Sequence, residues 1–353
     1  MDKNRLMRKS FDLGSASLVF LVAFGAQLVF QLIVIALGLS DAAKTWTIVI
    51  GNQLVLLAVT LAFCFGKKVD FLEITGLRRP PRWYYFPLFI LIAFACVATF
   101  APLAGVFSHL LSKLGYDYNP TYYIPTESKG LFTLAFLALT LLPLLGEETA
   151  VRGVVMSGGR ERSPLFAILY TALIFALTHG NLRQIVHQFL LGAVMGYLAY
   201  LTGGIYASGT VHLVNNGVAL LFEYGFKNGA IDPRAYWYVA GELGTKSTLI
   251  GVVVGFFALA MLLVLITCLI HRDRSRTGDY IPSEEGKFGS RVTRYLRFLS
   301  AFPDEKERDR TDGKKGEITG GDARRDRSYG TVMAILLAAV LAAIVLLSLI
   351  PEA

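Results

Sequence analysis

Two adjacent glutamates lie inside an apolar run, where a charged side chain is costly. The run reads Leu-Leu-Gly-Glu-Glu-Thr-Ala-Val-Arg-Gly, in which Glu147 and Glu148 are neighbours and Arg152 follows Glu148 by four residues. A charge in the middle of a membrane costs about 3 kcal/mol, so each one needs a reason. Because helical residues four apart share a face, Glu148 and Arg152 can form an ion pair. Glu147 points about 100° away and is left without a local cation, which makes it a candidate for chemistry.

Two histidines lie in later apolar runs, each with a distinctive residue one helical turn away. His179 follows Phe175 by four residues, and His212 precedes Asn216 by four residues. This spacing places His212 and Asn216 on one helix face, where both can hydrogen-bond a single substrate group. A lone histidine inside a membrane protein is more often a packing residue. Two histidines that accompany a glutamate pair indicate a shared polar site.

These residue types suit the hydrolysis of a peptide bond. In a mostly dry cavity, a glutamate can take a proton from water while an imidazole orients the nucleophile or relays that proton. A second histidine and an asparagine can donate hydrogen bonds to the charge that develops on the carbonyl oxygen. Zinc is also compatible with two histidines and one glutamate, and the ligands would then be Glu147, His179 and His212. The His-Glu-x-x-His pattern of many zinc proteases is absent, so no metal ligand is assigned.

The elements that must position these residues are membrane-spanning helices. Of the 353 residues, 54% are hydrophobic and 17% are charged, and the mean hydropathy is +0.53. This composition carries too much apolar surface for one soluble core. Only helices and closed barrels satisfy their backbone hydrogen bonds in lipid, and a helical span takes about 20 residues. Spans are predicted near residues 13–39, 45–65, 84–112, 130–157, 163–180, 185–201, 205–225, 247–271 and 330–350.

Composition divides the chain into three parts. Residues 1–271 predict a core of about eight helices, which holds all the candidate residues between positions 130 and 225. Residues 272–329 interleave basic and acidic side chains with almost no apolar periodicity, which predicts a disordered cytoplasmic segment. Residues 330–353 predict an additional C-terminal transmembrane helix, an anchor separable from the core. The predicted fold class is therefore all-α, a polytopic membrane helix bundle.

Charge and cysteine content exclude several classes of protein. The net charge is +8, but many basic residues lie in the mixed segment 272–329, so no nucleic-acid partner is expected. Cys64, Cys96 and Cys268 lie in apolar runs without a Cys-x-x-Cys pair, which excludes a disulfide framework and a thiolate zinc site. The expected partners are membrane lipid and a peptide or protein substrate. Basic residues near the N-terminus place that end in the cytoplasm by the positive-inside rule.

Three short patterns together resemble the ordered motifs of the CAAX protease and bacteriocin-processing family of intramembrane proteases, also called the Abi family. The patterns are Glu147-Glu148-x-x-x-Arg152, Phe175-x-x-x-His179 and His212-x-x-x-Asn216. The resemblance covers about residues 130–225, on three separate apolar runs. It implies an eight-helix core with the site inside the membrane, in the cell membrane of a bacterium.

The resemblance also implies a role for each matching residue. Glu147 would activate water with the help of His179, while His212 and Asn216 would stabilise the oxyanion. The supporting residues would be Glu148, Arg152 and Phe175. Family members have been described both as metalloproteases and as glutamate-dependent proteases, so the resemblance leaves zinc undecided. Eukaryotic relatives remove the last three residues after a prenylated cysteine, whereas bacterial relatives are linked to peptide maturation, bacteriocin self-immunity and signalling.

Two other functions use the same residues. In an ion- or proton-coupled transporter, the glutamates and histidines would form the ion pathway. Helices broken in matching halves would favour a transporter, but the break at Pro143 and Gly146 has no matching partner in the sequence. In a non-catalytic membrane scaffold or immunity protein, the polar residues would only pack helices. Replacement of Glu147 by glutamine separates these functions, because a scaffold would keep its function and a protease would lose it.

Overall fold

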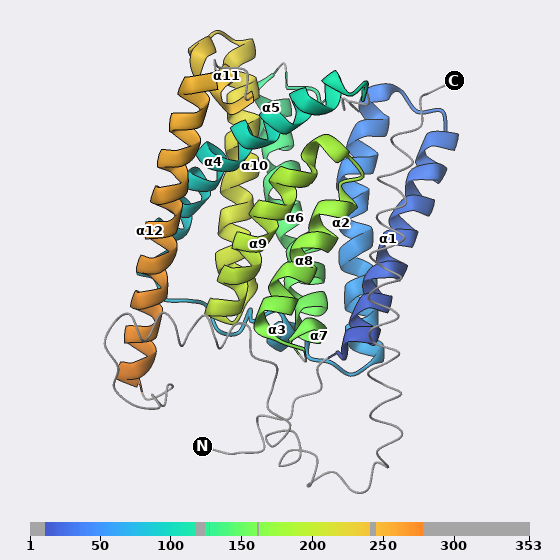
Figure 1. Cartoon of the computed structure of the whole chain (residues 1–353). Coiled ribbons are helices and arrows are strands. Elements are labelled where there is room, and N and C mark those ends of the chain that lie inside the picture. The colour runs from blue at the N-terminus through green and yellow to red at the C-terminus, as the bar shows by residue number, and fades with distance from the viewer. Residues whose placement is uncertain (1–10, 117–123, 127, 161, 241–244, 278–353) are drawn as a thin grey trace, which may run out of the picture.

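The computed structural model describes residues 11–116, 124–126, 128–160, 162–240 and 245–277. Within these ranges the chain forms helices and no strands, and long helices run side by side in one bundle (Figure 1). The predicted all-α helix bundle is therefore confirmed. The predicted anchor near residues 330–350, the charged segment beyond Thr277 and the basic N-terminal residues lie outside the described residues.

Eight long helices make up the described bundle. They are α1 (Leu13–Ala36), α2 (Asp41–Gly66), α4 (Phe86–Lys113), the composite helix Lys129–Gly159, α8 (Pro164–Thr178), α9 (Ile185–Thr202), α10 (Ile205–Lys227) and α12 (Thr245–Thr277). Short 3₁₀ turns, Trp83–Tyr85 and Leu182–Gln184, lead into α4 and α9. Two short helices, α3 (Phe71–Ile74) and α11 (Pro233–Ala240), lie at opposite ends of the bundle (Figure 1).

Six of the described helices are long and apolar enough to cross a membrane. They are Leu13–Ala36, Asp41–Gly66, Trp83–Lys113, Lys129–Gly159, Leu182–Thr202 and Thr248–Asp273. The apolar helix α8 has 15 residues and is about 22 Å long, which is shorter than the hydrocarbon core of a bilayer. The helix α10 carries polar residues of the candidate site and is not among the six. Both α8 and α10 pack within the bundle, so neither needs an apolar surface on all sides.

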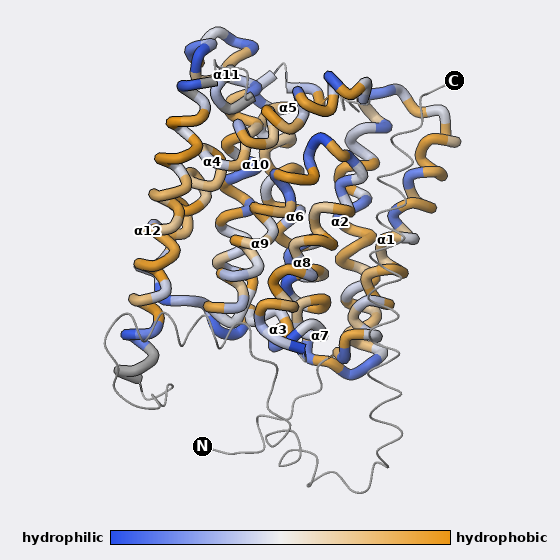
Figure 2. Tube along the Cα trace, in the orientation of Figure 1, coloured by the Kyte–Doolittle hydropathy of each residue, from blue (hydrophilic) through white to orange (hydrophobic). Residues whose placement is uncertain are grey.

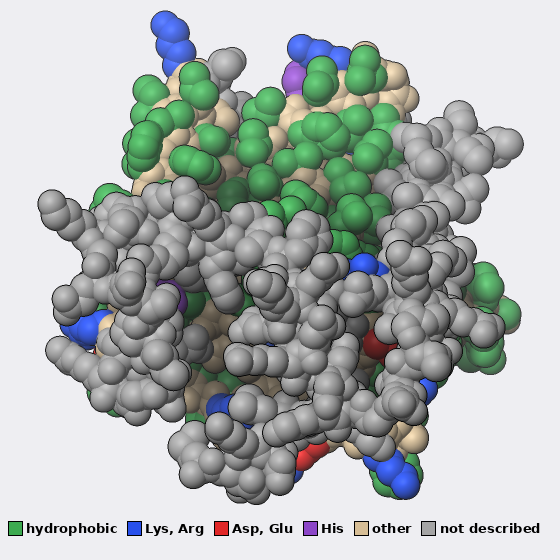
Figure 3. Space-filling model, turned by 60° about the horizontal axis from the view of Figure 1, so that its bottom comes forward, with side chains coloured by type: hydrophobic (Ala, Val, Ile, Leu, Met, Phe, Trp, Pro, Cys, Tyr) green, Lys and Arg blue, Asp and Glu red, His purple; other side chains and the backbone are tan. Residues whose placement is uncertain are grey.

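The outer faces of the bundle are apolar. On α1, Val29 and Leu32 are more than half exposed, and on α12 the same holds for Phe256 and Phe257. Figure 2 shows hydrophobic residues along most of each long helix and hydrophilic residues at the helix ends. Figure 3 shows hydrophobic side chains gathered on the flank of the bundle, with Lys and Arg side chains toward its ends. Because soluble monomers rarely expose such large apolar surfaces, the protein is an integral membrane protein.

The composite helix Lys129–Gly159 departs from regular α-helical geometry. Its segments are α5 (Lys129–Phe136), a π-helical stretch (Leu137–Leu141), α6 (Leu142–Glu147), a second π-helical stretch (Glu148–Val155) and α7 (Met156–Gly159). Such π-helical turns are rare and frequently lie at functional sites. The sequence analysis assumed one regular helix here. In the structure, the second π-helical stretch starts at Glu148, so the two adjacent glutamates lie on either side of a change in helix type.

Glycines allow α2 and α10 to approach the composite helix closely. A Cβ atom on Gly146 would lie 2.4 Å from the Oε1 atom of Gln53 on α2 and 3.0 Å from the backbone oxygen of Gln53. A Cβ atom on Gly209 of α10 would lie 1.9 Å from the side chain of Leu144. At each of these two glycines, a Cβ atom would come closer than 3.0 Å to a neighbouring side chain, so a larger residue would require movement. These contacts bring the glutamate pair against α2 on one side and α10 on the other.

Candidate active site

Glu148 forms a buried ion pair inside the bundle. Arg152 Nη1 lies 2.9 Å from Glu148 Oε1, and both side chains are 0% exposed. The Arg152 guanidinium also donates from Nη2 to the carbonyl oxygen of Gly192 on α9, at 3.4 Å. The ion pair expected from the four-residue spacing is therefore present. It ties the composite helix to α9.

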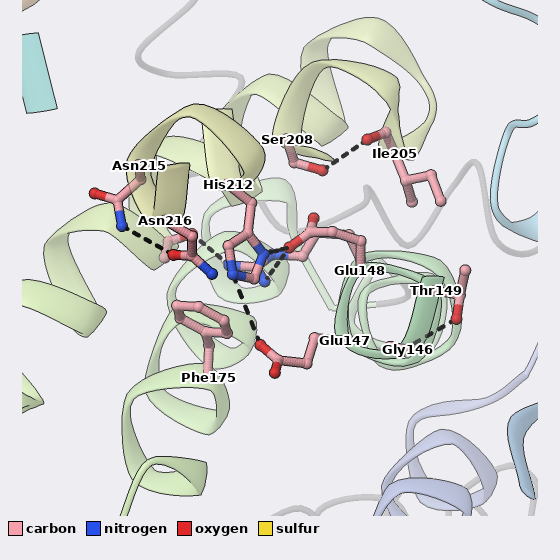
Figure 4. A network of polar contacts seen from close by, with 12 residues as sticks. Gly146, Glu147, Glu148, Thr149, Phe175, Ile205, Ser208, His212, Asn215 and Asn216 are labelled. Atoms are coloured by element: carbon pink, nitrogen blue, oxygen red, sulfur yellow. Dashed lines mark hydrogen bonds and ion pairs between the residues drawn. The ribbon is translucent and has the colours of Figure 1, made fainter. Parts of the chain in front are cut away.

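His212, on α10, lies between the two glutamates (Figure 4). Its Nδ1 atom is 3.0 Å from Glu148 Oε1, and its Nε2 atom is 3.8 Å from Glu147 Oε2. An ionised carboxylate only accepts hydrogen bonds, so the proton of this contact belongs to Nδ1. The other nitrogen, Nε2, faces Glu147. It can accept a hydrogen bond in the neutral ring and can donate one only when the ring carries a second proton.

Glu147 lies on a more accessible side of the same cluster. Its side chain is 23% exposed, whereas that of His212 is 3% exposed. Glu147 Oε1 accepts a hydrogen bond of 2.7 Å from Gln53 Nε2 on α2, which leaves Oε2 on the side of His212. Compared with Glu148, Arg152 and His212, Glu147 thus has the most exposed side chain.

His179 caps the end of α8 beside this accessible side. Its Nδ1 atom is 2.7 Å from the carbonyl oxygen of Phe175, so Nδ1 carries a proton and Nε2 is the acceptor in the neutral ring. The Phe175 ring contacts both histidines edge to face, with centroid separations of 4.9 Å to His179 and 5.4 Å to His212. The Arg152 guanidinium lies 4.4 Å from the same ring centroid. Phe175 therefore spaces the two imidazoles and packs against the buried ion pair.

Asn216 contacts the backbone of the composite helix. Its Nδ2 atom donates a hydrogen bond of 2.9 Å to the carbonyl oxygen of Leu139, and its Oδ1 atom accepts one of 3.2 Å from Asn215 Nδ2. Pro143 has no N–H group, so the Leu139 carbonyl lacks its usual donor four residues later. Asn216 supplies that donor instead. A carboxamide nitrogen carries two N–H groups, and the Leu139 contact uses one of them.

The structure thus brings the sequence-predicted residues into one cluster, but it does not join His212 and Asn216 directly. Among the described residues, no hydrogen bond links these two side chains, which lie next to each other in Figure 4. The sequence analysis expected both to address one substrate group. The structure adds a local reason for Asn216, the proline break, that four-residue spacing does not reveal.

Gln53 is a member of the cluster that the sequence analysis missed. Gln53 belongs to α2 and lies far in sequence from the three motifs, which all fall between positions 130 and 225. A signal was present, because the amides Asn52 and Gln53 interrupt an otherwise apolar run in the middle of that helix. Polar residues in the middle of a span are themselves unusual.

The residues considered for zinc do not form a ligand set in this arrangement. Among the described residues, no three His, Cys, Asp or Glu side chains are grouped as a metal ion requires. His212 Nδ1 is occupied by Glu148, and His179 Nδ1 is occupied by a backbone carbonyl. Each histidine would therefore offer only its Nε2 atom to a metal ion, with its Nδ1–H held by a carboxylate or a carbonyl.

Comparison with known proteins gives one match. Residues 129–218 match the family model described as Type II CAAX prenyl endopeptidase Rce1-like. The matched segment contains the glutamate pair, Arg152, both histidines and Asn216, whereas Gln53 and α12 lie outside it. Neither a curated protein nor a solved structure matches the chain. Over residues 129–218 the chain is similar to type II CAAX prenyl endopeptidases, which confirms the resemblance to the CAAX protease family that the three motifs indicated.

Proposed function

We propose that this protein is an intramembrane endopeptidase of the CAAX type that hydrolyses a peptide bond in a membrane-associated peptide or protein. The observation that carries the proposal is the accessibility of Glu147, which is 23% exposed beside a histidine and a fully buried ion pair. A carboxylate with this access can take a proton from water, whereas Glu148 is occupied by Arg152 and His212. The family match supports the same class of reaction.

The proposed reaction begins with water beside Glu147 Oε2. Glu147 takes one proton from this water, and the hydroxide attacks the carbonyl carbon of the scissile peptide bond. His179 Nε2, the free acceptor of its ring, orients the water. When the tetrahedral intermediate collapses, the carbon–nitrogen bond breaks and Glu147 returns its proton to the leaving amine. The products are a carboxylic acid and an amine, which become a carboxylate and an ammonium group when the acid proton passes to the amine, and the enzyme regains its starting protonation.

The negative charge of the tetrahedral intermediate needs hydrogen-bond donors. Asn216 has one N–H group beyond the one that it gives to Leu139. His212 adds a donor at Nε2 when its ring carries a second proton. Donors that are already oriented toward a developing oxyanion contribute strongly to catalysis in a water-poor site. Glu148, Arg152 and Phe175 would hold the ring of His212 in place.

The substrate proposed for a first test carries a prenylated cysteine near its C-terminus, because the matching family is described as prenyl endopeptidases. Membrane lipid and this peptide are the proposed partners. The proposed location is the cell membrane of a bacterium, with the N-terminus in the cytoplasm. Support for the orientation comes from Lys67, Lys68 and Arg78, which lie between α2 and α4, at the end of the bundle where α1 begins (Figure 1).

The test compares purified wild type with Glu147→Gln in lipid vesicles. The substrates are a library of membrane peptides and a farnesylated peptide with three residues after the modified cysteine. We expect cleavage by wild type and a rate about 10²- to 10⁴-fold lower for Glu147→Gln, because the general base is lost. Cleavage at the wild-type rate by Glu147→Gln would contradict the proposal. Substrate flux without a cleaved product would instead support a transporter, and binding without either would support a scaffold.

A further inference from the structure

Gln53 makes an amide-to-carboxylate contact that none of the three motifs includes. Its Nε2 atom donates to Glu147 Oε1 at 2.7 Å, from a different helix and 94 residues away in sequence. A carboxylate offers no donor, so the amide nitrogen and not the amide oxygen must face it. This fixes the orientation of the Gln53 amide.

We infer that Gln53 is a positioning residue that holds Glu147 Oε1, so that Oε2 is the oxygen directed toward His212 and the attacking water. The inference rests on the proposed function. The terminal torsion of a glutamate is broad, so an accessible carboxylate without a fixed partner samples many orientations. One hydrogen bond from a neighbouring helix selects a single orientation. Positioning of this kind has large effects, because a misplacement of about 1 Å can cost about 100-fold in rate.

Packing alone does not explain a glutamine at this position. The Oε1 atom of Gln53 is buried and has no hydrogen-bond partner among the described residues. A buried acceptor without a partner costs about 1–3 kcal/mol. A methionine has nearly the same length and would avoid this cost while filling the same space between α2 and the composite helix. The packing of these helices therefore does not require a glutamine. Among the described residues, the amide of Gln53 makes one polar contact, its hydrogen bond to Glu147.

The chain offers a matched control between α1 and α2, next to Gln53. Gln27, on α1, donates from Nε2 to the backbone oxygen of Asn52 at 2.9 Å, in a partly buried position next to Gln53. The contact is again between two helices and again uses a glutamine amide, but it does not involve the carboxylates. Gln27→Met thus removes the same chemical group without touching Glu147.

The experiment measures kcat, KM and thermal stability of the full-length wild type, Gln53→Met and Gln27→Met in lipid vesicles. The probe is an internally quenched farnesylated peptide with three residues after the modified cysteine. We expect Gln53→Met to lower kcat about 10- to 100-fold with KM within about twofold of wild type. We expect Gln27→Met to keep the wild-type kcat, and Gln53→Met to be at least as stable as Gln27→Met, because it no longer buries an acceptor without a partner. Equal kcat values for the two variants would overturn the inference, as would a loss of rate that only follows the loss of folded protein.

Glu147→Gln in the same assay separates this inference from the proposed function. If Glu147→Gln is inactive and Gln53→Met is fully active, only the positioning role fails. If Glu147→Gln cleaves like wild type, the role of Glu147 as the general base fails, and if wild type cleaves no peptide, the proposed function itself fails. An infrared measurement of the Glu147 carboxylate band, identified by its loss in Glu147→Gln, tests the contact without any substrate. The band should shift in Gln53→Met and not in Gln27→Met, and an unshifted band in Gln53→Met would overturn the inference.

Discussion

The candidate site has a closed side and an accessible side, and each contains one glutamate and one edge of the His212 ring. The closed side comprises Glu148, Arg152 and the Nδ1 edge of His212. The accessible side comprises Glu147, Gln53 and the Nε2 edge of His212. Glu148 is 0% exposed and meets a cation, whereas the side chain of Glu147 is 23% exposed and meets a neutral amide.

This difference indicates how the membrane protein tolerates two adjacent carboxylates. On the closed side, the charge of Glu148 is neutralised by Arg152, and the pair links the composite helix to α9 and α10. On the accessible side, Glu147 accepts a hydrogen bond from a neutral amide, and a carboxyl group inside a membrane is costly unless it has a function. We therefore propose that the closed side serves stability and the accessible side serves chemistry. Each of the following changes affects one side more than the other.

The largest effect on stability is expected for Arg152→Met, on the closed side. The variant leaves the buried charge of Glu148 without its cation, which should lower the free energy of unfolding by about 3–5 kcal/mol. The double variant Glu148→Gln/Arg152→Met removes both charges and should recover much of this loss. Unfolding by denaturant in detergent micelles measures both. A double variant as unstable as the single one would show that the ion pair does not govern stability.

The next effect concerns His179 on the accessible side. His179→Ala should lower the cleavage rate about 100-fold, because the water loses the acceptor that orients it. The free energy of unfolding should fall by only about 1 kcal/mol, because the lost hydrogen bond from Nδ1 to Phe175 joins two residues at the end of the same helix. The control is His109→Ala, an exposed histidine on α4, which should cleave like wild type. If the two variants cleave equally well, His179 has no part in the reaction.

A smaller effect is expected for the two residues that hydrogen-bond backbone carbonyl groups near prolines inside helices. Pro102 leaves the Ala98 carbonyl without its usual donor, and Tyr238 on α11 donates to it at 2.8 Å, as Asn216 does for Leu139. Tyr238→Phe and Asn216→Leu should each cost about 1–3 kcal/mol of stability.

The two variants should differ in activity. Only Asn216→Leu should also slow cleavage per folded molecule, because only Asn216 has a second donor near the accessible side. Thermal unfolding and single-turnover cleavage test this. Equal cleavage rates per folded molecule would mean that Asn216 serves the helix break alone.

The smallest effect is expected on removal of metal. Because the described residues contain no group of three metal-binding side chains, incubation with a chelator should leave the cleavage rate of wild type unchanged. The assay compares chelator-treated and untreated protein on the same farnesylated peptide. A loss of activity that added zinc restores would contradict this expectation, and would point again to Glu147, His179 and His212 as ligands.

The fold was largely predictable because its signals are local. An apolar run of about 20 residues has few ways to satisfy its backbone in a membrane, so the predicted starts at residues 13 and 205 coincide with those of α1 and α10. The ion pair of Glu148 and Arg152 was predictable for the same reason, since it depends only on spacing within one helix.

Contacts between helices were harder to predict. They depend on how each helix is rotated, and an almost uniformly apolar helix such as α2 does not specify its rotation. The contact of Gln53 with Glu147 was therefore missed. The π-helical stretches also left no pattern that a regular helical repeat would reveal, so the contact between Asn216 and Leu139 appears only in three dimensions.

The most direct test of the account compares Glu147→Gln with Glu148→Gln, by measuring cleavage per folded molecule and the free energy of unfolding of each variant. Both changes remove one negative charge and keep the size of the side chain. We predict that Glu147→Gln keeps wild-type stability and loses cleavage, whereas Glu148→Gln loses about 3–5 kcal/mol of stability and its folded fraction cleaves more slowly than wild type but faster than Glu147→Gln, because His212 loses only its positioning partner. The opposite pattern, with a stable but inactive Glu148→Gln and an active Glu147→Gln, would contradict the assignment of chemistry to the accessible side.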